Sequence, residues 1–68
     1  MKLSRYLTGP DDASFCHRVT AALNQGWELS GSPSLAFNSQ TGQMIAGQAV
    51  VKEVPGKDYD PAMKLSEQ

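Results

Sequence analysis

The apolar residues change from a helical to an alternating spacing at one short joint, residues 24–29. Gly26 stands where the helical spacing stops, and a helix often ends in a left-handed residue that glycine adopts at the lowest cost. The apolar residues that alternate beyond it are Trp27, Leu29, Leu35 and Phe37. This spacing is typical of a strand that buries one face. The joint therefore predicts a helix followed directly by a sheet.

Before the joint, residues 2–7 predict a first strand and residues 10–25 predict a helix. Thr8 or Gly9 would cap the helix, and Pro10 suits its first turn. The helical stripe that would face the sheet contains Phe15, Cys16, Val19, Ala22 and Leu23. Cys16 would then lie at the buried margin of the helix, while His17 would point into water.

After the joint, residues 27–37 predict a second strand and residues 43–54 predict a third. Gly31 and Pro33 interrupt the second strand and indicate a bend or bulge near an edge of the sheet. Residues 38–42 predict the hairpin turn between the two strands. The third strand would face the helix with Ile45, Gly47, Ala49 and Val51, whose small members allow a helix to approach closely.

The fold class is therefore α+β, with a single β-α-β-β domain over residues 1–54. A right-handed crossover predicts a three-stranded mixed sheet, with the third strand between the other two and one helix on one face. Residues 55–68 predict an irregular tail, packed either on the domain or on a partner subunit. The uncovered face would carry a candidate interface formed by Tyr6, Met44, Ala46 and Val50.

The length of 68 residues allows one domain and a marginal core. Small domains often gain stability from disulfides, a metal or a partner. One cysteine cannot form an internal disulfide, and one cysteine with one histidine cannot complete a zinc site. We therefore expect self-association, most simply as a dimer, with an unidentified protein partner as a further option and no cofactor.

The net charge of −1 is spread along the chain without a basic stripe, which argues against nucleic-acid binding. No apolar run resembles a signal peptide or a membrane span, so we expect no membrane association. A single unpaired cysteine suits a reducing compartment, and we expect a cytoplasmic protein.

Five short segments carry recognisable motifs: residues 8–12, 15–19, 26–29, 42–49 and 63–65. Together they resemble a small bacterial family of unknown function, numbered 1737, and the likeness extends over nearly the whole chain. The sequence Gly26-Trp27-Glu28-Leu29 is also similar to a second, broader family of short uncharacterised bacterial domains. The resemblance implies a compact bacterial α+β unit, and it implies no reaction, cofactor or catalytic residue.

Cys16 and His17 are the residues with the strongest candidate chemistry. Adjacent helical side chains point about 100° apart, so His17 is poorly placed to act as a base for the thiol. Asp11 and Asp12 are explained by the positive end of the helix dipole. The sequence favours a non-enzymatic interaction module over a small thiol- or histidine-dependent enzyme, and it predicts no catalytic, cofactor-binding or metal-binding residue.

Overall fold

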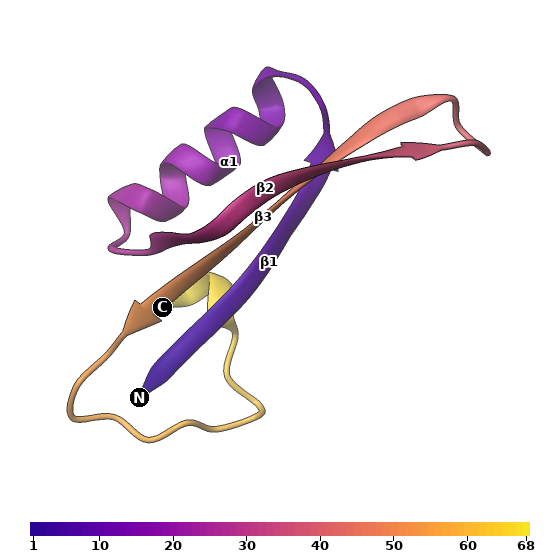
Figure 1. Cartoon of the computed structure of the whole chain (residues 1–68). Helices are drawn as coiled ribbons and strands as arrows, with labels where there is room; N and C mark the ends of the chain where they lie inside the picture. Colours follow the sequence, from indigo (N-terminus) through magenta and orange to yellow (C-terminus); the bar gives the residue numbers. More distant parts are fainter.

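The computed structural model describes all 68 residues and contains three strands, one α-helix and one 3-10 helix. Their order is β1 (Lys2–Pro10), α1 (Ala13–Asn24), β2 (Glu28–Asn38), β3 (Gln43–Glu53) and the 3-10 helix η1 (Leu65–Glu67). Figure 1 shows α1 lying along one part of the sheet, while the hairpin of β2 and β3 extends well beyond it. The molecule is accordingly elongated, with extents of 44 × 22 × 19 Å.

The sheet has the order β1-β3-β2, so β3 is the central strand and β2 is an edge strand, as predicted. β3 pairs with both neighbours in the antiparallel sense. The prediction of a mixed sheet is wrong for this reason: β1 and β2 do run parallel, but β3 separates them. The register of β2 shifts between Ser30 and Ser34, which confirms the predicted bulge.

The hydrophobic core lies between α1 and the sheet. Its buried residues are Leu3, Leu7, Ala22, Trp27 and Val50. Partly buried residues that pack against it come from the N-terminus, from α1 and from the segment after β3: Met1, Phe15, Val19, Val54, Met63 and Leu65. The last two show that the C-terminal segment returns to the core of the same chain, where η1 lies beside the β1–β3 end of the sheet (Figure 1).

The two faces of β3 are the reverse of the prediction. Val50 is fully buried in the helix-side core, whereas Gly47 lies on the opposite face under the side chain of Tyr6. A Cβ at Gly47 would lie 2.7 Å from a carbon of the tyrosine ring. Gly47 therefore makes room for the tyrosine ring on the open face, and it does not contact the helix as predicted.

The burial of Gln48 also contradicts the predicted faces of β3. Its polar side chain suggests solvent, yet only 5% of the residue is exposed. Its Nε2 atom donates to the carbonyl oxygens of Ser30 at 3.3 Å and Gly31 at 3.4 Å, and to that of Ala49 at 2.9 Å. A bulge leaves carbonyl groups without ladder partners, so a buried donor beside it satisfies groups that would otherwise be costly.

The helix begins later than predicted, because β1 continues to Pro10 and neither Thr8 nor Gly9 is the cap. Asp12 is the N-cap residue, and its carboxylate accepts a hydrogen bond from the Ser14 amide at 2.9 Å. The helix contacts the sheet with a narrower stripe than predicted, through Phe15, Val19 and Ala22. Cys16 and Leu23 of the predicted stripe are exposed.

The joint between α1 and β2 forms as predicted. Gly26 has a φ of 97°, and the amide of Trp27 donates to the carbonyl of Ala22 at 3.1 Å. Trp27 is 2% exposed, with the guanidinium of Arg5 5.4 Å from the centre of its ring. Lys52 Nζ donates to the carbonyl of Gln25 at 2.7 Å, which satisfies a backbone group at the end of the helix.

Candidate functional site

The four predicted interface residues do not share a face. Val50 and Ala46 are buried in the helix-side layer, at 0% and 6% exposure. Met44 lies on the same side of β3 as these two, but it is exposed. Tyr6 lies on the opposite face, where its hydroxyl oxygen is 2.5 Å from that of Ser34. Ala46 and Val50 are therefore core residues, and the single interface patch predicted from the sequence does not exist.

Four of the seven exposed large apolar residues lie instead on the β2–β3 hairpin, on the side of the sheet that α1 partly covers. We call this surface the hairpin strip, and it consists of Leu29, Leu35, Phe37 and Met44. Their exposed fractions are 55%, 60%, 63% and 40% respectively. The register places Leu35 opposite Ala46 and Phe37 opposite Met44, so all four side chains lie on the same face of the sheet as Val50.

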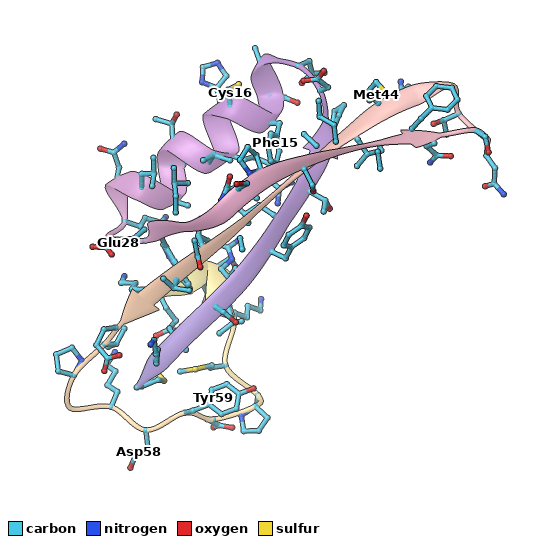
Figure 2. All side chains as sticks on the ribbon, viewed as in Figure 1. Phe15, Cys16, Glu28, Met44, Asp58 and Tyr59 are labelled. Carbon is cyan, nitrogen blue, oxygen red and sulfur yellow. The ribbon has the colours of Figure 1, made fainter.

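Next to the hairpin strip, a groove of about 270 Å³ separates the helix from the edge strand. We call it the α1–β2 groove. Its lining residues are Phe15, Cys16, Val19 and Thr20 of α1, with Leu29, Pro33 and Gln48 of the sheet. Figure 2 shows Phe15 and Cys16 on the first part of the helix, and Met44 on the hairpin beyond the end of the helix. Leu29 belongs both to the groove and to the hairpin strip, so the two form one continuous apolar surface.

The helix carries the only thiol of the chain at this groove. Cys16 is a free, exposed cysteine, so the predicted burial at the helix margin is wrong. His17 is its neighbour on the helix, which directs the two side chains apart. No cluster of three histidine, cysteine or acidic residues gathers anywhere in the chain. Cys16 is therefore an accessible thiol at the groove, and the adjacent His17 is not directed toward it.

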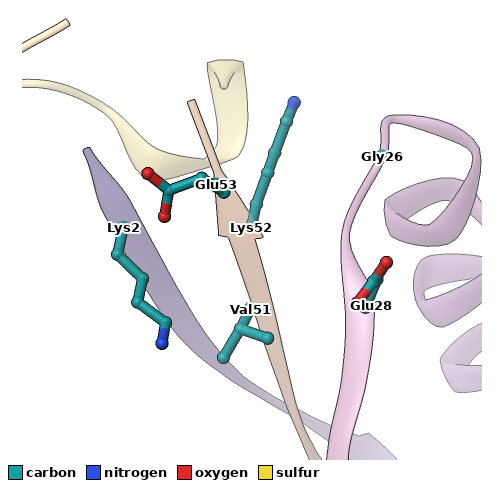
Figure 3. A pocket seen from close by; sticks show the side chains of 6 residues that line it. All are labelled: Lys2, Gly26, Glu28, Val51, Lys52 and Glu53. Carbon is teal, nitrogen blue, oxygen red and sulfur yellow. The ribbon is translucent and has the colours of Figure 1, made fainter. Parts of the chain in front are cut away.

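A second, more polar pocket of about 390 Å³ lies where the sheet meets the joint. It is lined by Lys2, Gly26, Glu28, Val51, Lys52 and Glu53. Figure 3 shows that the Lys52 side chain extends away from Val51 and Lys2. Its ammonium group is already bound to the carbonyl oxygens of Gln25 and Gln68. The charges of this pocket balance, and one of its two cations stabilises the fold.

The carboxyl group of Asp12 has a lowered pKa. The side-chain hydrogen bond from Ser14 is the main cause, followed by the backbone hydrogen bond from the same residue, and together they lower the pKa from its ordinary value of 3.8. The group is fully exposed and serves as the helix cap. Its shift is explained by capping and indicates no acid–base role.

The fold and this surface define a small α+β domain with an uncovered apolar hairpin. The model of the family described as "Domain of unknown function (DUF1737)" matches residues 1–53, and the chain belongs to this family. Neither a curated protein nor a solved structure matches the chain. None of its helices is long and apolar enough to cross a membrane.

Proposed function

We propose that this protein is a non-enzymatic interaction module that acts as a homodimer through the hairpin strip. The observation that carries the proposal is the exposure of Leu35 and Phe37, at 60% and 63%, on the same face of the sheet as the core. Large apolar side chains gathered on one surface are typical of a protein interface.

The size of the molecular surface supports a partner of this kind. A compact monomer of 7.3 kDa is expected to expose about 4,200 Å². This chain exposes 4799 Å². The excess of roughly 600 Å² approaches the ~800 Å² that each partner covers in an interface of standard size. The radius of gyration of 13.5 Å also exceeds the ~11 Å expected for 68 residues.

A second copy is the partner that the charge of the chain favours. The net charge of −1 produces little repulsion between two copies, and a strongly charged partner would find no complementary field on the hairpin strip. The hairpin strip consists of apolar residues alone, so it is complementary to another apolar surface. A second copy of the chain carries the same apolar surface and is always present at the same concentration as the first.

The experiment is a measurement of mass by light scattering over a broad dilution series, with the natural chain and two variants. We expect the natural chain to have twice the mass of 7.3 kDa at high concentration. Leu35→Asp places a charge on the hairpin strip and should yield monomers. Ala36→Asp is the matched control, because the next residue along β2 points to the other face. A natural chain that is monomeric at every concentration would refute the proposal.

A further inference from the structure

We infer that two copies associate edge to edge through β2, so that Phe37 of each copy enters the α1–β2 groove of the other. This inference rests on the proposed homodimer and specifies its geometry. It arises from three features: the free edge of β2, the position of the groove at one end of that strand, and the position of the exposed aromatic ring at the other.

The first step is the edge itself. β2 forms ladder hydrogen bonds with β3 alone, so its outer backbone groups have no strand partner. An exposed strand edge is a template for pairing with another chain. β2 has no lysine, the side chain that most often discourages such pairing, and its one charged residue is Glu28 at its first position. Its one proline, Pro33, lies within the bulge between Ser30 and Ser34, where regular pairing is already interrupted.

The second step is the symmetry. Antiparallel pairing of β2 with the same strand of a second copy places a two-fold axis perpendicular to the sheet. With the axis near Pro33, residues 28–30 of one copy would lie beside residues 36–38 of the other. Both helices would then lie on the same side of a six-stranded sheet. The face that carries Leu29 in one copy would continue into the face that carries Phe37 in the other.

The third step is the fit between the groove of one copy and Phe37 of the other. The groove of about 270 Å³ has a mainly apolar lining, and Leu29 of the edge strand is one of its lining residues. Phe37 is the most exposed large apolar residue of the chain, at 63%. The symmetric arrangement would bring Phe37 next to Leu29 of the second copy and under its helix, where Phe15 and Val19 line the groove. The helix of each copy would thus cover the hairpin end that the helix of the other copy leaves open.

Cys16 offers a direct test, because it is the only natural thiol and it lines the groove. In the variant Phe37→Cys, mild oxidation should link the new thiol of one copy to Cys16 of the other. The product should run at twice the monomer mass without reductant, and peptide mapping should find residues 16 and 37 joined. Ala36→Cys is the matched control, since its side chain lies on the other face, and it should give little of this product.

A second variant distinguishes the groove from other contacts. In Cys16→Ser combined with Phe37→Cys, the cross-linked product should disappear. If it persists, the two hairpin ends meet each other and the groove is not the acceptor, which overturns the inference. If Phe37→Cys still has the mass of a dimer in the presence of reductant but forms no link to Cys16 on oxidation, the inference fails while the proposed homodimer stands. If the natural chain is a monomer, the proposed function itself fails.

Discussion

The two ends of the β2–β3 hairpin have the same alternation of apolar residues but opposite environments. At the end near the joint, Val50 of β3 is fully buried beneath α1 and the returning C-terminal segment. At the far end, Phe37 and Met44 share the same face of the sheet and are exposed. The difference shows that the strand pattern decides which residues share a face, but an additional element decides whether that face is buried.

Element lengths explain the contrast in physical terms. The 12 residues of α1 span about 18 Å, because a helix rises about 1.5 Å per residue. The 11 residues of β2 reach up to about 36 Å at about 3.3 Å per residue. One helix of this length cannot cover the whole strand. The C-terminal segment packs at the β1–β3 end and leaves the hairpin uncovered (Figure 1).

The largest difference in the loss of stability is expected between the same substitution at two adjacent valines of β3. Val50→Asn would bury an unpaired amide in the core and should lower the free energy of unfolding by about 3–4 kcal/mol. That loss approaches the whole stability expected of a domain this small, so the variant should be largely unfolded. Val51→Asn changes the half-buried residue on the open face and should cost less than about 1 kcal/mol. Circular dichroism with urea titration measures both, and equal losses would contradict the assignment of the two faces.

Two phenylalanines provide the next contrast, with the same substitution at each end. Phe15→Ala removes packing against the core and should cost about 2–3 kcal/mol, somewhat below the range for a fully buried phenylalanine. Phe37→Ala removes an exposed ring and should change the stability of the monomer by less than about 0.5 kcal/mol.

The phenylalanine comparison requires a protein concentration at which the chain is monomeric, because association would add to the apparent stability. Thermal unfolding followed by circular dichroism gives both values. A large loss for Phe37→Ala under these conditions would mean that the ring packs within its own chain, which would remove the main support for the hairpin strip as an interface.

The sequence was sufficient to predict features that depend on local chemistry. Gly26 and Gly42 have the positive φ angles, 97° and 71°, that a helix end and a hairpin turn require. Trp27 belongs to the core, and Gly31 and Pro33 mark the bulge, as their residue types indicate. In each case a backbone requirement or a single large side chain decides the outcome, so no knowledge of distant contacts is needed.

The faces of β3 could not be predicted because both decisive residues depend on distant partners. Gly47 is small because Tyr6, from β1, lies over it. Gln48 is buried because the bulge of β2 exposes carbonyl oxygens to it. The alternating positions of Leu35 and Phe37 likewise did not indicate that their face is uncovered at this end of the sheet. The expected lengths of the helix and the strand predict this exposure, because the helix is the shorter element.

A smaller difference in stability is expected between alanine substitutions at Gly26 and Gly42, which both have a positive φ. Alanine in the left-handed region costs about 1–2 kcal/mol relative to glycine. At Gly26 this cost should appear in full, because the joint is tied to the core through Trp27 and a Cβ would meet Lys52 Cε at 3.4 Å. At Gly42 nothing lies within 4 Å of the new Cβ, and the end of the hairpin can rearrange locally. Urea denaturation should therefore show a larger loss for Gly26→Ala than for Gly42→Ala, and the reverse order would contradict the greater freedom assigned to the hairpin end.

The smallest effect is expected at Asp12, where the helix begins beside the hairpin and the amide of Asp11 donates to the carbonyl of Met44 at 3.1 Å. Because the folded state lowers the pKa of Asp12, the ionised carboxylate is bound more favourably there than in the unfolded chain. The resulting stability is present above the unfolded pKa and is lost as the pH falls through the lower folded value.

Asp12→Asn keeps a capping side chain but does not titrate. The natural chain should therefore have a slightly higher Tm than the variant at neutral pH, and this difference should shrink below about pH 4. A difference that is independent of pH would show that the charge of Asp12 contributes nothing, and that its oxygen acts only as a neutral cap.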